Sequence, residues 1–193
     1  MNEIYDHFDC YTRLPVLIDD VRNFIVARGV VDRIEFSATA MDDGALRGML
    51  NVHEELGAYG NRIVARIIYS RQISDDKWIR LVCCKELLHI LDREEETAST
   101  VEEVSHLIDH ITVPFEAGFP QPSMADHLGM IRALRILMPR DALHYLRIQL
   151  SEKNTTAEEI SRIAEVPLSF VQLSLLDEWW DYVNLAPQQV ASG

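Results

Sequence analysis

The chain has 193 residues, of which 48% are hydrophobic and 25% charged, and its formal net charge is −13. This length is typical of a single domain that can bury a sizeable core. The acidic balance disfavours nucleic acid and anionic membranes as partners, although it leaves a basic protein partner open. Three cysteines, two of them adjacent, make no disulfide framework, so we expect a reducing, cytoplasmic location. The sequence shows neither a signal peptide nor the roughly 20 apolar residues of a membrane span.

The pattern of apolar residues predicts one helix, then three strands, and then a series of helices. A helix is expected at 14–28, where apolar residues recur at helical spacing. Runs rich in Ile and Val predict three strands, at 34–39, 46–52 and 63–70. A long helix is expected at 75–91, with Asp75 among its candidate N-caps.

This order predicts an α+β fold, in which a small three-stranded antiparallel sheet packs with about six helices. We expect a single domain at 1–184, with a helical C-terminal part at 140–184 and a flexible tail at 185–193. Between the long helix and the C-terminal part, we expect a helix at 101–111 and then a loop rich in Pro and Gly at 112–123.

The helix expected at 75–91 carries one polar stripe on an otherwise apolar surface. On a helical wheel at about 100° per residue, Lys85, Glu86 and His89 fall within one arc. A buried polar group without a partner costs about 1–3 kcal/mol, so the stripe must face a polar cleft, water or complementary charges. The simplest alternative is that Lys85 and Glu86 are solvated and His89 is an ordinary histidine at the edge of the core.

The stripe reads as a metallopeptidase motif with one ligand replaced. In H-E-x-x-H the two histidines bind zinc from one helix face, and the Glu activates a water molecule. Here Lys85 stands at the first His, Glu86 at the Glu and His89 at the second His. A charged lysine has three donors and no acceptor for a metal.

The stretch from Ile67 to Pro139 resembles the ImmA/IrrE family of metallo-endopeptidases, which have a zincin-like fold. The family pattern is A-H-E-x-G-H, an acidic spacer, and then a helix of the form E-x-x-A-N-x-F-A-A-x-L-L-M-P. The matching segments here are Cys84-Lys85-Glu86-Leu87-Leu88-His89 and Ile136-Leu137-Met138-Pro139, and Ala133 falls on a family Ala. Asp126 stands where the family places a Glu as its third zinc ligand. The other departures are Leu88 for Gly, Gly129 for Ala, Met130 for Asn and Arg132 for Phe.

The resemblance implies two forms of the site. In an active one, His89 and Asp126 would hold zinc with residue 85, and Glu86 would be the general base. With Lys85 present, we expect instead a metal-free site in which the Lys85 ammonium takes the electrostatic place of the metal. It would pair with Asp126, and with Glu86 as a second candidate. No cofactor is then expected; zinc is the cofactor if the site is active, with His53 or His127 supplying the missing ligand.

Members of this family act on helix-turn-helix repressors, so the resemblance implies a protein partner of that kind, bound in the old substrate cleft. We therefore expect a pseudoenzyme with a regulatory role. The alternatives are an active zinc endopeptidase that cleaves a repressor and a transcription factor. The segment 143–176 looks like a helix-turn-helix, but its second helix, 168–176, has no Lys or Arg, so we expect it to pack on the core. Trp179 and Trp180 either cap the core or form a contact between copies of the chain.

Overall fold

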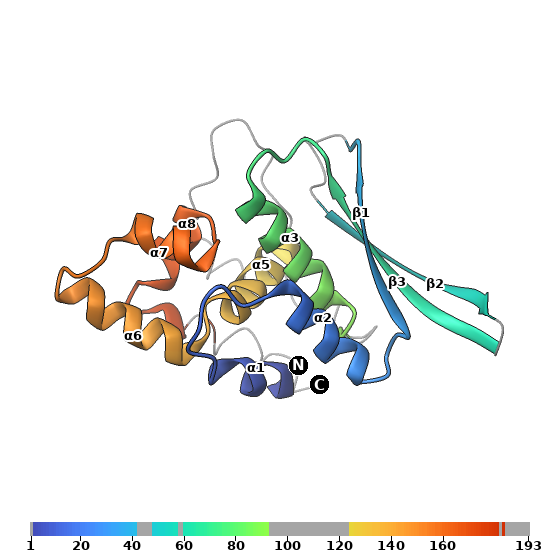
Figure 1. Cartoon of the computed structure of the whole chain (residues 1–193), viewed down its shortest axis with the longest axis horizontal. Coiled ribbons are helices and arrows are strands. Elements are labelled where there is room, and N and C mark those ends of the chain that lie inside the picture. Colours follow the sequence, from blue (N-terminus) through green and yellow to red (C-terminus); the bar gives the residue numbers. More distant parts are fainter. Residues whose placement is uncertain (1, 42–47, 58–59, 93–123, 182, 184–193) are drawn as a thin grey trace.

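A computed structural model describes residues 2–41, 48–57, 60–92, 124–181 and 183, and in the helix that begins at Met124 it describes side chains from Gly129 onward. The described elements are α1 (Asn2–Asp9), α2 (Ile18–Ala27), β1 (Arg33–Thr39), β2 (Gly48–Gly57), β3 (Gly60–Ser70), α3 (Asp76–His89), α5 (Met124–Leu137), α6 (Arg140–Ser151), α7 (Ala157–Ala164) and α8 (Leu168–Ser174). The sheet and the α6–α8 helices lie at opposite ends of the molecule, with α3 and α5 between them (Figure 1). This is the predicted α+β class with a small three-stranded sheet.

The sheet is mixed, with the strand order β1-β3-β2. β2 and β3 form an antiparallel hairpin from Gly48↔Tyr69 to Gly57↔Gly60. β1 runs parallel to β3, from Arg33↔Val64 to Thr39↔Ser70. The prediction of a wholly antiparallel sheet is therefore wrong at β1, because alternation along a strand identifies its two faces but not the direction of its neighbour.

The two faces of the sheet differ in what covers them. A Cβ atom built on Gly48 would point at Val82 of α3, so residue 48 faces the helices. Side chains alternate along a strand, so every second residue of β2 from Gly48 faces the helices. The register partners of these residues on β3 and β1 face the same way. Ile34 and Ile67 are among them, and both are buried. The opposite face carries a lattice of ion pairs that joins Arg33, Glu35, His53, Glu55 and Arg66.

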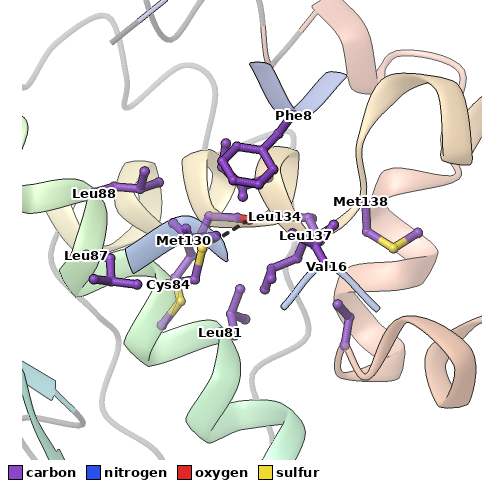
Figure 2. Packing of buried hydrophobic residues seen from close by; sticks show 14 of the residues in the cluster. Phe8, Val16, Leu81, Cys84, Leu87, Leu88, Met130, Leu134, Leu137 and Met138 are labelled. Atoms are coloured by element: carbon purple, nitrogen blue, oxygen red, sulfur yellow. Dashed lines mark hydrogen bonds between the residues drawn. The ribbon is translucent and has the colours of Figure 1, made fainter. Parts of the chain in front are cut away.

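α3 is the central helix of the core. It begins after Asp75, whose side chain accepts a hydrogen bond from the Lys77 backbone N–H at 2.9 Å, as a predicted N-cap should. Its apolar side chains pack against α5, with Phe8 and Val16 completing the cluster from the N-terminal part (Figure 2). The thiol of Cys84 donates to the Ala133 carbonyl at 3.9 Å, which marks how closely the two helices approach.

The C-terminal helices pack onto the same core. The Thr156 side chain caps α7, and Glu165, with φ of 52°, ends that helix in the left-handed conformation. Phe170 and Val171 of α8 are buried, and the Phe170 ring meets Trp78 of α3 edge-on, with 5.4 Å between centroids. The prediction that the helix within 168–176 packs on the core is therefore confirmed. α8 ends at Ser174, two residues before the end of the segment 168–176 in which the second helix was expected.

Several other expectations are corrected or fall outside the described residues. α1 was not predicted, and the helix expected from residue 14 begins at Ile18. Trp179 is fully buried within the core cluster, which settles its two alternatives in favour of the core. The helix at 101–111, the loop at 112–123 and the tail at 185–193 lie outside the described residues. No helix within the described ranges is long and apolar enough to cross a bilayer.

Candidate functional site

The polar stripe of α3 faces inward. Lys85 and Glu86 are only 5% and 3% exposed. Lys85 Nζ lies 2.9 Å from Glu86 Oε1, so the two groups form a buried ion pair. The contact meets the distance of an ion pair but not the angles of a hydrogen bond, and Oε1 has no hydrogen-bond partner. The alternative in which these two residues are solvated is therefore wrong, because β2 on one side and α5 on the other close off this part of the stripe.

Two glycines make room for this pair. A Cβ atom on Gly48 of β2 would lie 2.4 Å from Val82 Cγ1 and 2.9 Å from Glu86 Oε1. A Cβ atom on Gly129 of α5 would lie 2.7 Å from Lys85 Cγ. Real Cβ atoms do not approach other heavy atoms this closely, so each backbone can lie where it does only because the residue is glycine. The ion pair is thus held between the first residue of β2 and the middle of α5.

His89 belongs to a second group of charges at the end of α3. Its Nδ1 lies 2.6 Å from Asp92 Oδ2, and the other oxygen of that carboxylate lies 3.1 Å from Arg132 Nη1. A carboxylate accepts, so Nδ1 carries the proton, and in the neutral ring Nε2 is then left as an acceptor. Nε2 points toward α5, since it lies 3.3 Å from the position that a Cβ of Gly129 would take.

Sequence reasoning missed Asp92 and Arg132. Asp92 was given no role from the sequence, but its side chain is only 10% exposed. Its spacing of three residues from His89 was the available local signal, because residues at i and i+3 approach each other near a helix end. No local signal identifies Arg132, which lies 40 residues away from Asp92 in the chain.

Among the described residues, the predicted zinc ligands do not come together to form a complete metal site. α5 runs through position 126, but the side chains of Asp126 and His127 lie outside the described ones, so the pairing of Asp126 with Lys85 stays a prediction. His53 alternates with the residues that face α3, and its Nε2 lies 3.2 Å from Glu55 Oε1 on the opposite face. It therefore cannot serve as the replacement ligand that was considered.

The described residues do not fit a zinc ion. Among them, no three His, Cys, Asp or Glu side chains lie together as a metal site. A stronger argument is chemical: the position of the first ligand holds an ammonium, which has no lone pair to donate and repels a divalent cation. That ammonium is buried and ion-paired with the residue expected to be the general base.

The neighbouring cysteines add no reactive group. Burial, with a smaller contribution from the charge of Glu86, raises the pKa of the Cys83 thiol to about 12. Burial likewise raises the pKa of Cys84. A nucleophilic cysteine must be a thiolate, so these two buried thiols act as apolar side chains.

Comparison of the chain with protein-family models, with curated proteins and with solved structures gives no match in any of the three.

Proposed function

We propose that this chain is a catalytically inactive relative of the ImmA/IrrE metallo-endopeptidases that binds a protein partner without cleaving it. The observation that supports this most directly is the buried ion pair of Lys85 and Glu86, at 2.9 Å. Zinc peptidases need an open coordination position at which the metal activates water next to a carboxylate base. An ammonium supplies charge at this place but no coordination position, so Glu86 has no activated water to deprotonate.

Gly129 supports a coordinated change of the site rather than a single lost ligand. The resemblance expects Ala at this position of α5, and an Ala here would put its Cβ 2.7 Å from the Lys85 side chain. A lysine in place of the motif histidine is therefore accommodated by the loss of one methyl group on the facing helix. Arg132, where the resemblance expects Phe, similarly provides the cation that binds Asp92.

In the proposed site, ion pairs between side chains take the place of the metal, and the fold keeps its shape. Buried charges are tolerated only when opposite charges lie beside them. Lys85 of α3 meets Glu86 of the same helix, and Asp92, just beyond the end of α3, meets Arg132 of α5, so each of these buried charges has an opposite charge beside it. The Asp92–Arg132 contact ties the end of α3 to α5 in a region where a peptidase would hold its metal. The free thiols of all three cysteines fit the cytoplasmic location that is part of this proposal.

The partner is proposed from the resemblance to be a basic helix-turn-helix regulator. The chain's net charge of −13 favours a basic partner electrostatically. A helix-turn-helix protein encoded beside this chain is the first to test. It should bind in a titration calorimeter at moderate salt, and its mass should be unchanged after prolonged incubation with zinc. Cleavage that requires Glu86 would overturn the proposal.

Reversion of the two substituted positions tests the metal-free site. The variant carrying Lys85→His together with Gly129→Ala restores both residues that the resemblance expects. We expect it to bind zinc at least about tenfold more tightly than the wild-type chain, because a neutral nitrogen replaces a repelling cation. Lys85→Met is the control that removes the charge without adding a ligand. Equal zinc affinity in all three proteins would contradict the assignment of this site.

A further inference from the structure

The β2–β3 hairpin extends beyond the helices that cover the rest of its inner face (Figure 1). Every second residue of β2, counted from Gly48, faces the same side of the sheet as Gly48 and therefore faces α3. Near the helices this face is buried, as Ala65 and Ile67 show. Toward the tip of the hairpin the same face becomes exposed.

The exposed part of this face is apolar. Val52 is 52% exposed, Leu56 is 89% exposed and Ile63 of β3 is 41% exposed. The register pairs residue 54 with 63, so Ile63 lies diagonally next to both Val52 and Leu56, which stand on either side of residue 54. We call these three residues the tip patch. These exposed apolar side chains continue a face that is buried nearer the helices. Such a group of exposed apolar residues is typical of an interaction surface.

The charges around the tip patch are acidic and are not neutralised by nearby cations among the described residues. Glu54 lies between Val52 and Leu56 on the same face, and its carboxylate accepts from the Asn61 amide at 3.0 Å. Asp32, at the level of Ile63, accepts from the Ile63 backbone N–H at 2.7 Å. On the opposite face, by contrast, Glu35 and Glu55 both pair with arginines. The acidic groups beside the tip patch therefore attract cations.

We propose that the tip patch is the docking surface for a basic amphipathic helix of a protein partner. The layer geometry argues for a helix, because α2 and α3 already occupy the adjoining part of this face and a third helix would continue their layer. The charge argues for lysines or arginines flanking the apolar stripe of that helix. A second copy of this chain is disfavoured, since it would bring Glu54 against its own counterpart in two molecules of net charge −13. The inference rests on the partner-binding part of the proposed function and is independent of the metal question.

The test uses a labelled helical peptide of about 18 residues, with leucines on one face and lysines on the other, and measures fluorescence anisotropy with the full chain. Val52→Thr combined with Leu56→Thr should weaken binding by about tenfold or more. Glu54→Gln should weaken it severalfold and reduce its dependence on salt. The matched control is Met49→Thr, at an exposed residue of the same strand that faces the other side, which should leave binding unchanged.

Three outcomes would overturn this surface: no binding of the peptide, equal binding by the wild type and the double variant, or equal weakening by Met49→Thr. A dimer in sedimentation that the double variant abolishes would also overturn it and would assign the patch to a second copy. Zinc content, measured on the same samples, reports separately on the metal-free site. Failure of the peptide experiment with no zinc bound would thus reject the surface and leave the proposed site standing.

Discussion

A Cβ atom on Gly129 would lie 2.7 Å from Cγ of Lys85, so the helix that faces the motif can approach it only without a side chain at that position. Lys85 and Gly129 come from α3 and α5, which are separated in the sequence and packed together in the core. The pair explains how a long cationic side chain fits into a site where a shorter histidine is expected. It also makes the account testable by stability measurements alone.

Gly129→Ala should destabilise the protein in spite of the better helix propensity of alanine. Propensity favours Ala by about 1 kcal/mol in a helix interior, but overpacking costs about 1–3 kcal/mol. Combined with Lys85→Ala, the same substitution should become neutral or stabilising, because the colliding atoms are gone. Urea unfolding of the wild type, both single variants and the double variant measures this coupling. A stabilising effect of Gly129→Ala in the wild-type background would show that the two helices do not approach as described.

Glu86→Gln should be more destabilising than its small change in shape suggests. It removes the negative charge 2.9 Å from the Lys85 ammonium inside the core. Breaking one side of a buried ion pair costs about 3–5 kcal/mol, whereas replacing both partners by apolar residues is often close to neutral. The double variant Lys85→Met with Glu86→Leu should therefore be more stable than Glu86→Gln alone. Thermal unfolding compares them, and the reverse order would contradict the burial of this pair.

The sequence predicted the helix at 75–91 and its polar stripe because both depend on periodicity within a single element. The direction of β1 was not predictable in this way, since β1 pairs with β3, and β2 lies between these two strands in the sequence. The partners of the stripe were missed for the same reason. Gly48 and Arg132 come from elements whose approach to α3 depends on tertiary packing, and Gly129 was noted as a departure from a pattern without its cause.

Thiol reactivity should distinguish the three cysteines. Cys10 is exposed, whereas Cys83 and Cys84 are buried. With a pKa of about 12 for Cys83, the thiolate fraction at pH 8 is about one in ten thousand. We expect one equivalent of thiol to react with a disulfide reagent in the folded protein and three in urea. Cys10→Ser serves as the control and should leave the folded protein unreactive. More than one fast-reacting thiol would contradict the placement of Cys83 and Cys84.

The ion-pair lattice on the outer face of the sheet should weaken in acid. A side-chain hydrogen bond from Arg66, helped by the charge of Arg33, lowers the pKa of Glu35. A lowered pKa in the folded state stabilises the protein above the unfolded-state value and ceases to do so as the pH falls through the folded value. The wild type should therefore be more stable than Glu35→Gln at pH 7, and the difference should shrink as the pH falls below the unfolded-state pKa of about 4.3 and vanish once the pH is below the lowered pKa of the folded state. Unfolding midpoints measured from pH 7 to pH 3 test this, and a difference that persists in acid would contradict it.

Zinc stoichiometry tests the central claim most directly. The full chain would be produced without chelator, equilibrated with a small excess of zinc, passed through a desalting column and measured by plasma mass spectrometry. The account predicts far less than one zinc per chain in the wild type and a clear gain in the variant carrying Lys85→His and Gly129→Ala. One zinc per wild-type chain, lost on His89→Ala, would show that Lys85 does not occupy the place of the metal.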